Sequence, residues 1–181
     1  MARLSTPSTT EVHRAIETFA RGFAFTRSFT HPAEAVFVNP LWGVRDTPRR
    51  RSDYRREEWI ACNVDPAEVD AIARRHTRGR FSICAIHGER DDDAALRAGY
   101  KSLGYRVQTT EPFMTHSLQR IPRFDAQVRI ERVCTPELLE RLNRSAGRAM
   151  IRREHLELPK QIRVYAALDG DKPIGWGRSI T

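Results

Sequence analysis

The stretch RFSICAIHGERDDDAALRAGYKSLGYRVQTTEPFMTHSL, residues 80–118, carries the strongest secondary-structure signals in the chain. Phe81–Ile86 is a short apolar run with β-branched residues, which predicts a buried strand. Residues 91–93 are three aspartates, whose oxygens can cap a helix start and whose charge suits the positive end of the helix dipole. Apolar residues then recur at helical spacing until Gly104, a common helix stop. Residues 106–118 complete a predicted strand–helix–strand unit.

Upstream of this unit, the sequence predicts two helices and a strand region. Residues 65–75 form a predicted helix, because Asp65 suits the N-cap position and Pro66 suits the first helical position. Residues 11–24 carry apolar side chains at helical spacing, which predicts another helix. Residues 23–46 are rich in aromatic and β-branched residues and are interrupted by prolines, so one or two strands are expected there.

Downstream of the unit, strands and helices alternate again. Residues 126–133 alternate between apolar and charged side chains, which predicts a half-buried strand. Residues 136–142 follow a threonine and begin with proline, which predicts a helix, and a second helical piece is expected over 146–156. Residues 162–168 and 174–180 are expected to form a hairpin. The whole pattern predicts an α+β fold with a mixed, largely antiparallel sheet flanked by helices.

The chain is strongly basic, with a net charge of +8, which favours anionic partners. Three of the 31 basic residues are lysines and the other 28 are arginines, a bias typical of a GC-rich coding sequence. Six of the arginines lie between Arg45 and Arg56, next to Trp42, Tyr54 and Trp59. This basic loop could bind nucleic acid or another polyanion, with aromatic rings stacking on bases. The interpretation we favour is a solvated loop in which the interleaved acidic residues pair with the arginines.

The composition and the cysteine spacing indicate the cellular compartment in which the protein is expected. Three widely spaced cysteines do not suggest a disulfide framework and favour a reducing environment. No apolar run approaches the roughly 20 residues of a membrane span, and the N-terminus has no apolar signal segment. We therefore expect a cytoplasmic protein without membrane contact. Cys84 and His87 have the spacing of half of a zinc site. Residues three apart in a strand point to opposite faces of the sheet, and no second Cys/His pair follows in the sequence. We therefore expect no metal site.

Two segments resemble the GNAT superfamily of N-acetyltransferases. Tyr100-Lys-Ser-Leu-Gly104-Tyr105 resembles the end of that family's late helix, which reads Tyr-x-x-x-Gly-Phe/Tyr before a strand. The strand, helices and hairpin after residue 125, which end in Ile174-Gly-Trp176, resemble the opening of the family fold. The resemblance implies a degenerate N-terminal lobe over residues 1–124 and the start of a second, incomplete lobe over residues 125–181.

The resemblance implies an acetyl-CoA-dependent N-acetyltransferase that acts on a small-molecule or peptide amine. Tyr100 is at the position of the tyrosine that protonates the departing coenzyme A thiolate in many members of the family. Glu111 could contact the amine, and Trp176 could line the acceptor groove. Each residue also has a structural alternative. Tyr100 and Trp176 could be core aromatic residues, and Glu111 could lie at an exposed strand edge.

The chain departs from the family at the acetyl-CoA site. The family holds the pyrophosphate with Arg/Gln-x-x-Gly-x-Gly/Ala between a strand and a helix, where backbone N–H groups and the helix dipole face the phosphates. The formal match here is residues 144–149, which follow a predicted helix instead of a strand. Three explanations fit this departure: the chain is a truncated or split tandem enzyme, a permuted or diverged relative, or a non-catalytic domain. We favour truncation. The edge of strand 174–180 is expected to favour pairing with another copy of the chain.

Overall fold

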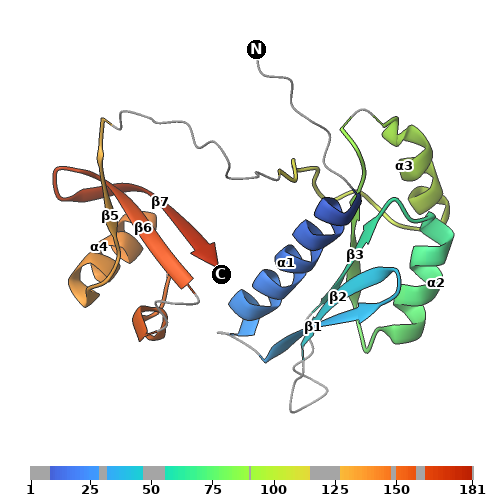
Figure 1. Cartoon of the computed structure of the whole chain (residues 1–181), viewed down its shortest axis with the longest axis horizontal. Coiled ribbons are helices and arrows are strands. Elements are labelled where there is room, and N and C mark those ends of the chain that lie inside the picture. The colour runs from blue at the N-terminus through green and yellow to red at the C-terminus, as the bar shows by residue number, and fades with distance from the viewer. Residues whose placement is uncertain are drawn as a thin grey trace. The chain divides into compact units, whose positions relative to one another are not determined.

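The computed structural model shows two compact units, Met1–His116 and Ser117–Thr181, which are described separately (Figure 1). The structure describes residues 9–28, 32–46, 56–89, 91–114, 127–147, 150–157 and 162–180. None of the helices in these ranges is long and apolar enough to cross a membrane.

The first unit is built on a four-stranded mixed sheet in the order β1–β2–β3–β4. β1 (Ala33–Val38) and β2 (Leu41–Asp46) form a hairpin, and β3 (Glu57–Cys62) pairs antiparallel with β2. β4 (Phe81–Ile86) is parallel to β3 and is reached through α2 (Pro66–His76). The predicted α+β class and mixed, largely antiparallel sheet are therefore confirmed.

Helices cover both faces of this sheet (Figure 1). Because side chains alternate along a strand, each face supplies its own apolar surface. α1 (Thr9–Ser28) packs on one face, and the buried residues of that cluster are Ile16, Ala20, Ala24, Val44 and Ile60. α2 packs on the other face, and the buried residues of that cluster are Leu41, Trp59, Ala61, Val69 and Ala73.

α3 (Asp93–Ser102) follows β4, and its two ends match the predicted signals. Asp92 is the N-cap, with its carboxylate accepting a hydrogen bond from the N–H of Ala94. Just past the helix, Gly104 has a φ of 87°, a left-handed conformation that favours glycine. The predicted helix and its stop are confirmed.

The predicted strand over 106–118 is wrong for its described part, residues 106–114, which contains no strand. This segment is held by side chains instead. Gln108 accepts a hydrogen bond from Arg56 (3.0 Å), and Phe113 lies edge-on against Phe19 with ring centroids 5.5 Å apart. The physical reason is that these residues are mostly polar and include a proline, which has no N–H for a ladder. Residues 115–118 lie outside the described residues.

β3 is the main element that the sequence pattern did not reveal, because it directly follows the arginine-rich stretch and begins with two glutamates. It nevertheless lies inside the sheet, between β2 and β4. The predicted helix over 65–75 and the strand at Phe81–Ile86 are confirmed. The predicted helix over 11–24 extends to Ser28, so the strand region begins later than expected.

The second unit is a three-stranded antiparallel sheet, β5–β6–β7, with a helix. β6 (Ile162–Asp169) and β7 (Lys172–Ile180) form the predicted hairpin, while β5 (Arg129–Arg132) is shorter than the predicted strand. α4 (Pro136–Ala146) ends at a left-handed glycine, Gly147. In the described part of the helical piece expected over 146–156, the structure has, after α4, a short 3₁₀ turn, η2 (Arg153–Glu157).

Candidate ligand-binding site

A cavity of about 280 Å³ lies at the carboxyl ends of β3 and β4. Parallel strands joined by a helix commonly place ligand sites at this end, because the loops leaving the strands border one crevice. We call it the carboxyl-end cavity. Its apolar walls are Ala61, Val64, Ala85, Ile86 and Leu96, and its polar lining is Asn63, His87, Asp91, Asp92 and Tyr100.

The loop between β4 and α3 fixes two carboxylates in the cavity wall. Asp91 accepts a hydrogen bond from the N–H of Gly88 through Oδ2 (2.8 Å), and Asp92 accepts one from the N–H of Ala94 through Oδ1 (2.9 Å). A Cβ at position 88 would lie 2.7 Å from Asp91 Oδ2, so a side chain there would force the Asp91 carboxylate to shift. Each carboxylate thus uses one oxygen to hold the loop and can present the other to a ligand.

Tyr100 reaches the cavity from α3. Its ring packs edge-on against Tyr105 at 5.7 Å, and the Tyr105 hydroxyl donates to Asp70 of α2. The Tyr100 hydroxyl is buried and has no hydrogen-bond partner among the described residues. Burial, with smaller contributions from Asp65 and Cys84, raises the pKa of Tyr100 to about 12. The phenol is therefore protonated near neutral pH.

We expect Tyr100→Phe to reduce the loss of stability at alkaline pH. The pKa of Tyr100 in the folded chain, about 12, lies above its ordinary value of 10.0, so the folded state disfavours the phenolate. Stability is therefore fully present below pH 10 and is lost as the pH rises toward 12. The test is urea unfolding of both proteins at a series of pH values across this interval. Tyr105, whose pKa is also raised by burial and by Asp70, is retained in both proteins. An identical alkaline loss in the variant would contradict the expectation.

The other two predicted site residues belong to other elements of the chain. Glu111 is on the segment after α3, where it accepts a hydrogen bond from Thr109 (3.3 Å). Burial, followed by the charges of Glu58 and Glu111, raises the pKa of Cys84, which packs with the buried cluster between the sheet and α1. Tyr100 packs with the other buried cluster, between the sheet and α2. Trp176 belongs to the second unit, on β7, where it is 42 % exposed. Neither of these residues lines the carboxyl-end cavity.

Sequence reasoning did not single out the acidic lining of the cavity. It treated residues 91–93 only as helix-starting aspartates. The missing signal was that β3 and β4 are parallel neighbours, which brings the loop after each strand to the same place. Without β3 in the predicted fold, that juxtaposition could not be expected.

The strand-to-helix junctions beside the cavity do not fit a pyrophosphate, the group that the GNAT resemblance requires at such a junction. At the start of α2, Asp65 accepts hydrogen bonds from the N–H groups of Ala67 (2.8 Å) and Glu68 (3.4 Å). At the start of α3, Asp92 occupies the equivalent capping position. The N–H groups that would bind phosphate are therefore engaged by the protein's own carboxylates, whose negative charge opposes an anion. Residues 144–147 lie at the C-terminal end of α4. This is the negative end of the helix dipole, which repels a phosphate group.

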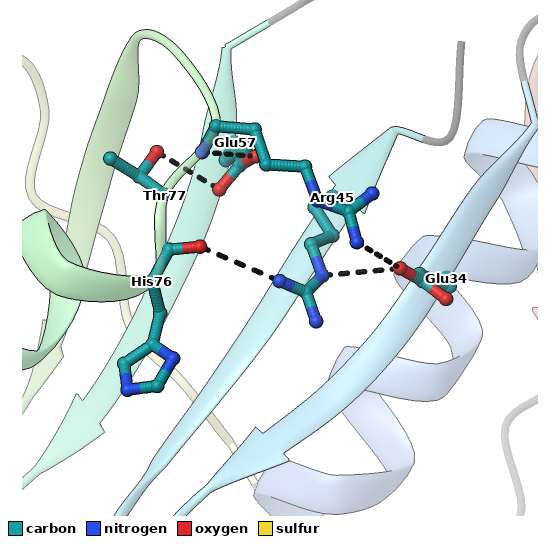
Figure 2. A network of polar contacts seen from close by, with 6 residues as sticks. Glu34, Arg45, Glu57, His76 and Thr77 are labelled. Carbon is teal, nitrogen blue, oxygen red and sulfur yellow. Dashed lines mark hydrogen bonds and ion pairs between the residues drawn. The ribbon is translucent and has the colours of Figure 1, made fainter. Parts of the chain in front are cut away.

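The basic loop lies largely outside the described residues, which include Arg45 and Arg56 at its ends but not 47–55. Arg45 forms an ion pair with Glu34 (3.1 Å) and donates to the carbonyl of His76 (3.5 Å), as Figure 2 shows. Arg56 donates to Gln108 (3.0 Å). Both end arginines are thus engaged in internal contacts. These partners are not the interleaved acidic residues, so the pairing that the solvated-loop interpretation expects stays a prediction.

Comparison of the chain with protein-family models, with curated proteins and with solved structures finds no match.

Proposed function

We propose that the chain is a relative of the GNAT N-acetyltransferases whose first unit binds a small ligand in the carboxyl-end cavity without holding acetyl-CoA there. The observation that carries the proposal is the pair of aspartate caps, Asp65 and Asp92, at both strand-to-helix junctions beside the cavity. The resemblance at Tyr100 and Gly104 supports a relationship to the GNAT family. The two aspartate caps support the proposal that this chain has lost the family's coenzyme site. The cavity itself supports retention of a binding role.

Tyr100 has a different role in this proposal from the one that the family resemblance implies. A proton donor for a thiolate needs the coenzyme beside it, and the acidic caps oppose its pyrophosphate. Tyr100 lines the cavity, where its aromatic ring can pack against a bound ligand. Tyr100 is therefore assigned to ligand binding, and Glu111 and Trp176 are given no role at this cavity.

The experiment is calorimetric titration of the 181-residue chain with acetyl-CoA at moderate salt. We expect no binding, or binding weaker than about 1 mM, which corresponds to a free energy smaller than about 4 kcal/mol. Acetyl-CoA hydrolysis and acetyl transfer should be undetectable, and Tyr100→Phe should change neither result. Micromolar binding that is lost on adding free coenzyme A would contradict the proposal and restore the enzyme interpretation.

The net charge of +8 supports one alternative, a polyanion-binding module that uses the basic loop between Arg45 and Arg56. Binding of this kind depends on counterion release and falls steeply with salt. Titration with a nucleic-acid homopolymer at low and high salt distinguishes the two functions, because binding in an acidic cavity does not require a polyanion.

A further inference from the structure

We infer that residues 152–157 of the second unit are an acid-sensitive segment, which protonation of His155 releases from its packing beside β6. We call these residues the His155 segment; they include η2. His155 is 8 % exposed and lines a cavity of about 210 Å³ together with Ile162 and Val164 of β6. The inference concerns the second unit alone and does not rest on the ligand site proposed for the first unit.

Two reciprocal hydrogen bonds between Arg152 and His155 close the turn that leads into η2. The N–H of Arg152 donates to Nδ1 of His155 (3.3 Å), and the N–H of His155 donates to the carbonyl of Arg152 (3.1 Å). A backbone N–H can only donate, so Nδ1 is the acceptor and carries no proton in this arrangement. Protonation of the ring places a hydrogen on Nδ1, and the imidazolium has no acceptor left for the N–H of Arg152. The closed turn therefore requires a neutral His155.

The surroundings of His155 also disfavour its charged form. Burial lowers the pKa of His155 below the ordinary value of 6.5, and the charges of Arg178 and Arg152 lower it further. Glu154 acts in the opposite direction, but its charge does not outweigh the other contributions. A proton that binds His155 in the closed segment thus enters a buried site with two arginines nearby.

The cavity beside His155 offers an imidazolium little stabilisation. Ile151 and Leu156 line it from the chain around η2, opposite the apolar side chains of β6. Arg132 and Cys134 are the other ionisable residues among the described residues that line it, and no carboxylate does so. A charged ring is better stabilised by water, which it reaches when the segment moves away from β6.

Asn143 of α4 limits how far this release extends. Its Oδ1 accepts hydrogen bonds from the N–H groups of Met150 (2.8 Å) and Ile151 (3.4 Å), and its Nδ2 donates to the carbonyl of Ile151 (3.0 Å). An amide side chain does not titrate, so these three hydrogen bonds do not depend on pH. Ile151 is therefore the expected pivot, and the His155 segment is the part that opens.

The direction of the pH dependence follows from the lowered pKa. The open segment has the ordinary pKa of 6.5, so the closed form is fully favoured above pH 6.5 and loses stability as the pH falls below it. One proton changes the equilibrium constant for opening by at most about tenfold per pH unit.

The test is amide hydrogen exchange of the full chain, followed by NMR from about pH 7 to about pH 5 and corrected for the intrinsic exchange rate. We expect the protection of the Arg152 amide to fall roughly tenfold across this range, in step with the titration of the His155 ring signals. Ala166, at the centre of β6, is paired on both sides and should keep its protection. Loss of Arg152 protection alone would show local opening.

His155→Asn separates the titration from the hydrogen bond. Its side-chain oxygen can take the place of Nδ1 as acceptor for the N–H of Arg152, and it does not titrate in this range. The Arg152 amide of this variant should therefore be equally protected at both ends of the pH range. His13→Asn is the matched control, because His13 is an exposed histidine on α1, and it should show the same fall as the unmodified chain.

Three results would overturn the inference. The first is Arg152 protection that stays constant while His155 titrates. The second is an equal fall in His155→Asn and in the control. The third is a parallel fall at Ala166, which would indicate acid unfolding of the whole unit. Should His155→Asn fail to fold, the unmodified chain decides alone, through the agreement or disagreement between the His155 titration and the Arg152 protection.

Discussion

Trp59→Ala is expected to lower the free energy of unfolding of the first unit by about 4 kcal/mol, which is the range for large-to-small changes of buried aromatic residues. Trp59 is 0 % exposed and belongs to the buried cluster between the sheet and α2. A Cβ at position 43 would lie 3.0 Å from Trp59 Cζ3, so the indole packs directly on the bare backbone of Gly43. The sheet backbone cannot move to fill the space that alanine leaves, so a cavity should remain.

Urea unfolding followed by far-ultraviolet circular dichroism measures this loss. Phe37→Ala is the control, because Phe37 lies in the same sheet but is 54 % exposed, and its loss should be less than about 1 kcal/mol. Similar losses in the two variants would mean that Trp59 is not a core residue and that β3 does not lie inside the sheet.

The elements that could be predicted from the sequence are those with local signals at their ends. The α2 helix begins with an aspartate cap and a proline, and α3 begins with an aspartate cap and is followed by a left-handed glycine. The β6–β7 hairpin has a central turn that contains a left-handed glycine. In each case the backbone conformation is determined by residues within a few positions, so local chemistry is sufficient.

β3 could not be predicted for the opposite reason. Its first residue, Glu57, is a charged side chain that is 1 % exposed, and charge at a strand start usually indicates solvent. Its burial is explained only by Thr77 and Arg78, which lie 20 and 21 residues later in the sequence. The residues of the carboxyl-end cavity were hard to predict for the same reason, because they come together only through contacts between distant parts of the sequence. Tyr100 was selected through a local motif and lines the cavity, but the aspartates around it became cavity residues only through the parallel pairing of β3 and β4.

Replacing Glu57 with alanine is expected to lower the free energy of unfolding by about 2 kcal/mol, because it leaves the partly buried N–H of Arg78 without its acceptor and removes one of the two acceptors within reach of the Thr77 hydroxyl. Glu57 Oε1 accepts a hydrogen bond from the N–H of Arg78 (3.1 Å), and Oε2 accepts one from the Thr77 hydroxyl (3.0 Å). Figure 2 shows the Thr77 contact, which joins the end of α2 to the start of β3. The carboxylate thus holds the turn between α2 and β4 against the sheet.

Two further variants separate these hydrogen bonds from charge alone. Glu57→Gln keeps one acceptor oxygen and should lose about 1 kcal/mol, since one of the two hydrogen bonds can be retained. Glu17→Ala removes an exposed glutamate that pairs with Arg21 within α1, and its loss should be at most about 0.5 kcal/mol. Amide hydrogen exchange at Arg78 should accelerate in Glu57→Ala and remain unchanged in Glu17→Ala. If Arg78 exchanges at the same rate in both variants, the buried carboxylate does not hold this turn, and the predicted loss of stability has no structural basis.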